Sequence, residues 1–343
     1  MVHHVPHGKR TLFERESELT AVDEALSELC GLSRDGSEPP DRSRGALIAF
    51  AGRAGIGKTS LLAEARRRAA AKGCTVASAR GGEQEQRVAF HVARQLVQPL
   101  LASVPDAELR DVLGSWYAIV GPALGLCAPP DGAPPDPQGL RDGLDWVLTH
   151  LAVQRAPLVV VVDDAHWADA ESLSWLSAFA PRAEALPLLL VVAYRPEELP
   201  AHADEFRGLP GRAGQRPIGL EPLSATAVAR LVRDTLGARA DDAFCRECWA
   251  VTAGNPFEAV ELTAKVRDRG LTPDEAGAHL LRDLAAAVKG NGLVARLERL
   301  GTSTVRLAWA CAVIGTSIPP ALAAAVAGIG EREAADCADR LRR

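Results

Sequence analysis

The chain has 343 residues, a formal net charge of −5 at pH 7 and seven cysteines. Its length suggests two or three domains and is sufficient to bury a sizeable core. A negative net charge without a dense Lys/Arg block excludes an overall basic surface for nucleic acid, and an odd number of scattered cysteines excludes a disulfide framework. No apolar run is long enough to span a membrane and the N-terminus lacks a signal peptide, so we expect a cytoplasmic protein.

The first expected elements are a tail, a helix and a loop. Residues 1–10 have no helical or strand period, and we expect a disordered tail. Residues 11–30 have apolar side chains at helical spacing, with Ser17 as the expected N-cap. These apolar side chains are Leu19, Val22, Leu26 and Leu29. The polar, Pro-rich segment 31–45 predicts a loop.

Residues 46–60, ALIAFAGRAGIGKTS, are typical of a strand, a glycine-rich loop and the start of a helix over 59–72. They match the P-loop, or Walker A, pattern G-x-x-x-x-G-K-[ST] at every fixed position. The glycines let backbone N–H groups point at phosphate oxygens, and the helix N-terminus favours negative charge. Lys58 would reach the β- and γ-phosphates, and Thr59 would bind Mg²⁺. The expected nucleotide-binding residues are Gly52, Arg53, Ala54, Gly55, Ile56, Gly57, Lys58, Thr59 and Ser60.

The region that follows predicts one strand and two helices. Cys74–Ala79 is the strand, and the apolar spacing favours helices over Val88–Val104 and Leu140–Val153. The Pro-rich residues 128–138 between the two helices predict an exposed loop.

Residues 157–169, PLVVVVDDAHWAD, form the second informative stretch. A continuous β-branched run suits a strand buried on both faces of a parallel sheet, and ligands bind at the carboxyl ends of such strands. This is a Walker B pattern, in which Asp163 would bind Mg²⁺ and Asp164 would polarise the attacking water. Asp164 is one methylene shorter than the usual Glu, which predicts slow hydrolysis. The alternative is a strand that ends in two solvated acids.

A third buried strand at 187–196 ends in Arg195, which is placed to sense a γ-phosphate, although a strand-end arginine is often merely solvated. Ile218 and Leu220 mark a short fifth strand. About a hundred residues separate Walker A from Walker B, which favours the ATPase arrangement, in which the later strand lies between the other two. Neither asparagine of the chain is followed by lysine, so the guanine-reading Asn-Lys-x-Asp motif is missing. We therefore expect ATP.

From Ser224 the sequence predicts helices. Ser224 is the expected cap of the first, and Pro256 is the expected N1 residue of the third. Cys245 and Cys248 share a helix face, which favours packing over zinc or redox chemistry. The expected helices are Ala225–Leu236, Asp241–Ala253, Pro256–Arg269 and Glu331–Arg343.

With these motifs the chain resembles the ATPase module of STAND-class AAA+ (AAA-16) proteins, and more narrowly that of the large LuxR-type (LAL) transcriptional regulators. The matching stretches are FERESEL, GRAGIGKTS, VVVVDDAHWADAESLSWL, LLLVVAYRPEE and AGNPFEAVEL, which cover about residues 11–265 in order. Glu14 stands where the family usually has glycine. The C-terminal helix-turn-helix of those regulators is not visible in this chain.

The resemblance implies an α/β P-loop NTPase of the AAA+/ASCE type, with a parallel sheet and flanking helices, followed by an all-α lid and a partial winged-helix-like region. The implied domains are an ATPase core at 11–222, a lid at 223–275 and an incomplete winged-helix-like segment at 276–343. Lys58, Asp164 and Arg195 would be catalytic, and Pro256 would lie near the adenine. The implied ligands are ATP or ADP and Mg²⁺.

Three hypotheses remain open at this point. The first is a weak ATPase that acts as a signalling switch, with nucleotide-dependent homo-oligomers and an unknown inducer or partner protein. The second is a P-loop phosphotransferase acting on a small molecule, for which residues 80–94 are the nearest candidate acceptor lid. The third is a nucleotide-binding scaffold that does not hydrolyse ATP. A stand-alone AAA ATPase is the related alternative to a regulator.

Overall fold

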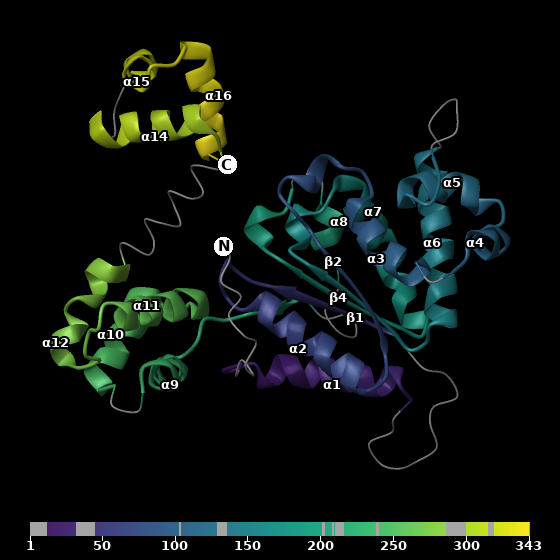
Figure 1. Ribbon diagram of the computed structural model, residues 1–343, viewed down its shortest axis with the longest axis horizontal. Helices are drawn as coiled ribbons and strands as arrows, with labels where there is room; N and C mark the ends of the chain where they lie inside the picture. The colour runs from purple at the N-terminus through teal and green to yellow at the C-terminus, as the bar shows by residue number, and fades with distance from the viewer. Residues whose placement is uncertain are drawn as a thin grey trace. The chain divides into compact units, whose positions relative to one another are not determined.

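The computed structural model describes residues 12–31, 45–102, 104–128, 136–200, 203–207, 209, 216–237, 240–285, 300–314 and 319–342. The chain divides into two compact units between Leu223 and Ser224, and each is described by itself (Figure 1). The predicted tail at 1–10 and most of the predicted loop at 31–45 lie outside the described residues.

A parallel five-stranded sheet organises the first unit. The strands run in the order β2-β3-β4-β1-β5, so β4 lies between β1 and β3. This position confirms the ATPase arrangement that the motif spacing predicted. The strand bounds are Ala46–Ala51 for β1, Thr75–Arg80 for β2, Leu158–Asp163 for β3, Leu188–Tyr194 for β4 and Ile218–Gly219 for β5.

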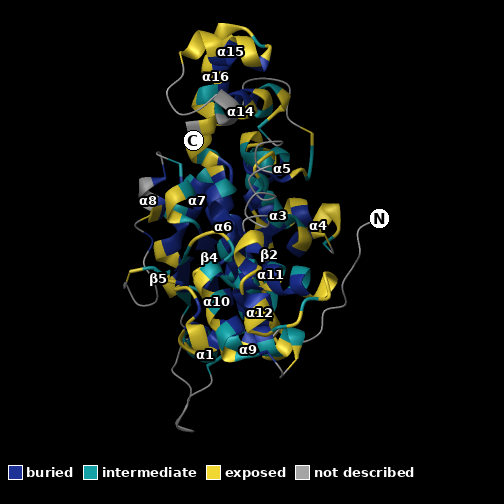
Figure 2. Cartoon of the chain, turned by 90° about the vertical axis from the view of Figure 1, so that its left-hand side faces the viewer, coloured by how far each residue is buried: buried dark blue, intermediate teal, exposed yellow. Residues whose placement is uncertain are grey.

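The sheet is covered on both faces because successive side chains of a strand point to opposite sides. In β1, Leu47 and Ala49 pack into one core cluster, and Ile48 and Phe50 pack into another. Every residue of β3 and β4 is buried, which explains their continuous apolar sequences (Figure 2). The carboxyl ends of these strands meet at one edge, where the motifs lie.

The helices of the first unit flank this sheet, with α1 and α2 on one face and α3, α6 and α7 on the other (Figure 1). Four short 3₁₀ segments join them: η1 (Glu85–Arg87), η2 (Ala165–Trp167), η3 (Ala180–Ala185) and η4 (Pro196–Glu198). The helix bounds are Glu16–Leu29 for α1, Lys58–Ala71 for α2, His91–Leu101 for α3, Asp106–Leu113 for α4, Trp116–Leu124 for α5, Pro137–Gln154 for α6, Ala170–Phe179 for α7 and Asp204–Arg207 for α8.

Two helix starts in this unit differ from the prediction. Helix α1 begins at Glu16 with Arg15 at its N-cap, so the assignment of Ser17 as the cap was wrong, and the Ser17 hydroxyl instead donates to Glu18 at 2.8 Å. Helix α6 begins at Pro137, inside the predicted loop, because Asp136 caps it by accepting from the Gly139 N–H at 3.1 Å.

Helix α3 is shorter than the predicted helix 88–104. It begins only at His91, because Phe90 has a left-handed φ of 57°. The N–H groups of Phe90 and Val92 both donate to the Asp169 carboxylate, at 2.8 and 3.1 Å. A buried carboxylate 79 residues away in the sequence therefore sets where this helix begins, which local spacing cannot show.

The regular elements among the described residues of the second unit are all helices, in agreement with the prediction. Ser224 caps α9 by accepting from the Ala227 N–H, as predicted, and Asn255 caps α11 with Pro256 at N1. The second unit contains α9 (Ala225–Leu236), α10 (Asp242–Thr252), α11 (Pro256–Asp268), α12 (Glu275–Ala278), α14 (Thr302–Ile314), α15 (Pro320–Ala327) and α16 (Glu331–Arg342). Its finer division into a lid at 223–275 and a winged-helix-like segment stays a prediction.

The C-x-x-C pair packs in the core of the second unit. Cys245 and Cys248 are both buried in α10 and both are free thiols. Burial raises the pKa of Cys248 to about 12, so its reactive thiolate form is suppressed. The helix-face interpretation is confirmed.

Among the described helices, none combines the length and apolarity that crossing a bilayer requires.

Candidate functional site

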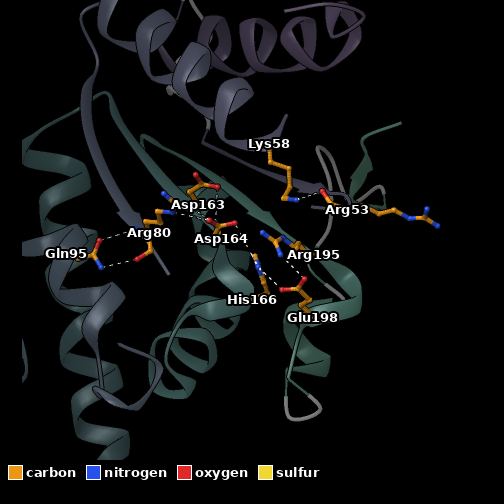
Figure 3. A network of polar contacts seen from close by, with 9 residues as sticks. All are labelled: Arg53, Lys58, Arg80, Gln95, Asp163, Asp164, His166, Arg195 and Glu198. Carbon is orange, nitrogen blue, oxygen red and sulfur yellow. Dashed lines mark hydrogen bonds and ion pairs between the residues drawn. The ribbon is translucent and has the colours of Figure 1, made fainter. Parts of the chain in front are cut away.

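The loop after β1 is shaped for close approach to an anion. Gly55 and Gly57 have positive φ angles of 74° and 102°, which an L side chain rarely adopts. Gly57 is the N-cap of α2, so the first free N–H groups of that helix follow directly. Thr59 and Ser60 lie in this first turn. Ala54 is exposed, and Figure 3 shows the Arg53 side chain directed away from the polar cluster.

Lys58 is held back against this loop. Its Nζ donates to the carbonyl oxygens of Gly52 at 2.7 Å and of Arg53 at 2.9 Å, and the residue is only 5% exposed (Figure 3). Burial lowers the pKa of Lys58, and the positive charge of Arg195 lowers it further. A nearby anion would therefore be strongly favoured by this ammonium group.

Thr59 and Asp163 are brought together from two elements. The Thr59 hydroxyl donates to the Asp163 carboxylate, which lies at the carboxyl end of β3. Burial raises the pKa of Asp163, and the neighbouring Asp164 raises it further. A hydroxyl and a carboxylate in contact are oxygen ligands of the type that Mg²⁺ shares with substrate phosphates, so these residues fit that ion.

Asp164 is fixed by a residue that we did not assign from the sequence. Arg80, at the end of β2, donates through Nε and Nη2 to Asp164 Oδ2, at 3.0 and 2.7 Å. The backbone of Arg80 is in turn held by Gln95, whose amide makes two 3.0 Å hydrogen bonds to it (Figure 3). Asp164 itself has a left-handed φ of 47°, a conformation in which Asp is enriched several-fold over most residues. This backbone geometry gives a physical reason for Asp rather than Glu.

Arg195 follows β4 and lies beside the same cluster. Its Nη1 donates to Glu198 Oε1 at 2.7 Å, and its Cζ lies 4.9 Å from the centre of the Trp167 ring. Trp167 is in the segment after Walker B, so this contact joins the tips of β3 and β4. The Arg195 Nε–H is buried without a hydrogen-bond partner in the described part of the chain.

His166 lies at the centre of these charges. It is fully buried, and its Nε2 is 3.5 Å from Glu198 Oε2 and 3.9 Å from Asp164 Oδ1. Burial, together with the positive charge of Arg195, lowers the pKa of His166 to about 4, so the ring is neutral at pH 7. Neither ring nitrogen has a hydrogen-bond partner among the described residues.

The structure therefore brings together most of the predicted site residues. Lys58, Thr59, Asp163, Asp164 and Arg195 all lie at the carboxyl edge of the sheet. Pro256 lies in the second unit, so its predicted place near the adenine stays a prediction.

Sequence reasoning missed three participants, Arg80, Glu198 and Arg15. Arg80 ends the strand next to β3, which was the available signal. Arg15 is 5% exposed, and its Nη2 donates to the carbonyls of Ile56 in the P-loop and of Glu221, at 3.1 and 2.7 Å. No sequence spacing indicates those contacts.

The strand order, the glycine loop and the acids at the tip of β3 define a P-loop NTPase fold. Residues 11–192, more than half of the chain, match the AAA ATPase domain family (AAA_16). The chain belongs to this AAA ATPase domain family.

The chain is similar to a curated sequence relative and to solved structures. An uncharacterised protein of Rhizobium meliloti (strain 1021), R02095, is 27% identical over 329 residues; the match covers 87% of this chain and only 30% of that protein. The Orc1 protein of Aeropyrum pernix, solved in complex with DNA, has a TM-score of 0.60 at 14% identity and covers 97% of this chain and 84% of its own. A STAND protein of Pyrococcus horikoshii with a tetratricopeptide repeat sensor has a TM-score of 0.43 at 14% identity, over 75% of this chain and 30% of its own.

Proposed function

We propose that this protein binds ATP with Mg²⁺ and hydrolyses it slowly to ADP and phosphate. The observation that supports this most is the meeting of Lys58, Thr59, Asp163 and Asp164 at one edge of the sheet, beside a glycine loop with free helix N–H groups. Walker A and Walker B are about a hundred residues apart in the sequence. Two motifs that matched by chance would not be expected to place their side chains at the same edge of the sheet.

Each residue has a role in this proposal. The N–H groups that follow Gly57 bind the phosphates, and Lys58 exchanges its two carbonyl partners for the β- and γ-phosphate oxygens. Thr59 and Asp163 would hold Mg²⁺, which neutralises phosphate charge when bound. Arg195 contacts the γ-phosphate. Asp164 orients water, and because Arg80 occupies Oδ2, we assign Oδ1 as the oxygen that accepts the water proton.

Three features support slow turnover. The Asp164 side chain is one methylene shorter than glutamate, and its backbone sits in a left-handed conformation that limits adjustment. Arg80 also holds the carboxylate in an ion pair at 2.7 Å, so Oδ2 already accepts hydrogen bonds from the guanidinium and is not available to water. A slow hydrolytic step would keep the protein in its ATP-bound state for a long time, as a signalling switch requires.

We further propose that nucleotide state controls conformation and self-association, as in the signalling modules of LuxR-type (LAL) regulators. The support is the sequence resemblance over residues 11–265 and membership of the AAA ATPase domain family. Light scattering of the purified chain with ADP and with a non-hydrolysable ATP analogue tests this. Equal masses in both states would contradict the switch, and leave ATP binding to be judged separately.

The hydrolysis proposal is tested by phosphate release from ATP in magnesium buffer. We expect slow release by the wild type, about 100-fold less with Asp164→Asn, and no change with Asp142→Asn, which removes an exposed carboxylate on α6. Unchanged release with Asp164→Asn would contradict the assignment of the base and favour a scaffold. ATP consumption that yields a phosphorylated small molecule, with no free phosphate, would favour the phosphotransferase.

A further inference from the structure

Arg195 already has a negatively charged partner in this structure. Glu198, in the turn η4 directly after Arg195, accepts a hydrogen bond from Arg195 Nη1 at 2.7 Å. The two side chains are 18% and 27% exposed, so water screens this ion pair only in part. The Trp167 ring contacts the same guanidinium from the β3 side, at 4.9 Å from its centre. The guanidinium therefore has one defined resting position.

In this position the guanidinium of Arg195 lies beside the proposed phosphate site, but its Nη1 donates to the carboxylate of Glu198. Carboxylates and phosphates are alternative acceptors for the same planar N–H donors of arginine. Arg195 cannot give the same Nη1 hydrogen to Glu198 and to a γ-phosphate at once. Glu198 and the third phosphate of the nucleotide therefore compete for the Nη1 donor of Arg195.

The two ionisable neighbours His166 and Glu197 do not contact Arg195 as Glu198 does. His166 lies 3.5 Å from the second carboxylate oxygen, but it is neutral near pH 7 and does not neutralise Glu198. Glu197, the preceding residue, is exposed and acts on the site only through its charge. This pair of neighbouring glutamates separates the effect of contact with Arg195 from the effect of charge.

We propose that Glu198 is a specificity-determining residue that sets the preference of the site for ATP over ADP, by competing with the γ-phosphate for Arg195. This inference rests on the proposed function. ADP has no γ-phosphate, so it leaves the Arg195–Glu198 pair intact and its affinity does not depend on Glu198. ATP must break that pair, so the pair lowers ATP affinity. The Arg195–Glu198 pair therefore lowers the affinity for ATP relative to the affinity for ADP.

The test compares the dissociation constants of ADP and a non-hydrolysable ATP analogue, both with Mg²⁺, by calorimetry. With Glu198→Gln we expect the ATP analogue to bind roughly three- to tenfold more tightly relative to ADP, because the variant loses a charge-assisted hydrogen bond from the free and ADP-bound protein but not from the ATP-bound protein. Glu197→Gln removes the same charge and should leave the ratio nearly unchanged. In an Arg195→Gln background, Glu198→Gln should have no further effect on the ratio.

Three results would overturn the proposal: equal behaviour of Glu198→Gln and Glu197→Gln, a parallel shift for both nucleotides, or a weaker relative affinity for the ATP analogue. The same titrations separate this inference from the proposed function. If the wild type binds the ATP analogue and Lys58→Ala does not, the function stands and only the role of Glu198 is in question. If the wild type binds neither nucleotide, both are wrong.

Discussion

The two units of this protein differ in which polar side chains they bury and in how many large apolar side chains they expose. In the described residues of the first unit, several acidic and basic side chains are buried: Arg15, Glu18, Lys58, Asp145, Asp163, Asp164, His166 and Asp169. In the second unit the buried polar side chains of the described part are threonines, Thr252, Thr263 and Thr304, whose hydroxyls donate to carbonyls of the preceding helical turn.

Exposed large apolar side chains are concentrated in the described part of the second unit, although Val88 and Val153 of the first unit are exposed as well. Trp249, Phe257, Val260 and Trp309 are each at least 41% exposed, and all belong to the second unit. A parallel sheet can bury charges because its strand ends converge and supply partners for one another. A helix satisfies its own backbone and buries an apolar stripe. The difference shows that the sheet edge gathers buried charged groups, which is where we propose the chemistry, whereas the described helical unit buries apolar side chains and threonines.

A large effect is expected from the carboxylate buried at the tip of β3. Asp163→Asn keeps the size of the side chain but removes the carboxylate that we assign to Mg²⁺. We expect the magnesium-dependent part of ATP affinity to fall by about 10–100-fold. Calorimetric titrations with Mg²⁺ and with a chelator measure this part directly. A Mg²⁺ effect of the wild-type size in Asp163→Asn would contradict the assignment.

The next prediction concerns the close approach of the backbone after β2 to the backbone after β3. A Cβ at Gly81 would lie 2.3 Å from the carbonyl oxygen of Asp164 and 2.7 Å from the Ala168 nitrogen, so the backbone of the Walker B segment must move. We expect Gly81→Ala to lower ATP turnover roughly ten- to hundredfold. The matched control is Gly219→Ala in β5, where an added Cβ meets nothing within 4 Å. Equal turnover in both variants would show that Asp164 tolerates displacement.

A third effect concerns pH. The pKa of His166 is about 4 in the folded chain and 6.5 for an ordinary histidine, so between these values the unfolded chain binds more protons. The stability that neutral His166 provides is therefore present above pH 6.5 and is lost as pH falls toward 4, on the order of 3 kcal/mol in total. Chemical denaturation of the wild type and His166→Leu across this range should show a smaller loss for the variant. Parallel curves would contradict the neutral, buried histidine.

The smallest effect lies in the helical unit. Ala253 ends α10 with a left-handed φ of 47°, which costs an L residue about 1 kcal/mol. Ala253→Gly should raise the stability of the second unit by up to about 1 kcal/mol, as measured by thermal unfolding. Ala250→Gly makes the same change inside α10 and should lower stability by a similar amount. Destabilisation by both variants would contradict backbone strain at Ala253.

Much of the sheet was predictable because its strands are local and strongly patterned. The apolar runs of β1, β3 and β4 were placed within about one residue, and Lys58, Asp163 and Asp164 follow from spacing alone. The order β3-β4-β1 was also predictable, because the distance between the motifs and the presence of a later buried strand favour it.

Long-range contacts were not predictable from local pattern. The start of α3 depends on hydrogen bonds to Asp169. The orientation of the Asp164 carboxylate depends on hydrogen bonds from Arg80, 84 residues earlier. Arg195 was assigned as a sensor, but its partners Glu198 and Trp167 depend on how the tips of two strands meet. Arg15 contacts the P-loop across 41 residues, which no periodicity indicates.

The central claim is that the edge of the sheet binds the triphosphate of ATP through Lys58. The most direct measurement is calorimetric titration of ATP in magnesium buffer into the wild type, Lys58→Ala and Lys72→Ala. Lys72 ends the same helix at its far, exposed end, so its loss controls for charge. We predict saturable binding by the wild type and Lys72→Ala, and at least about 100-fold weaker binding by Lys58→Ala. Equal binding by all three folded proteins, or binding by none, would contradict the account.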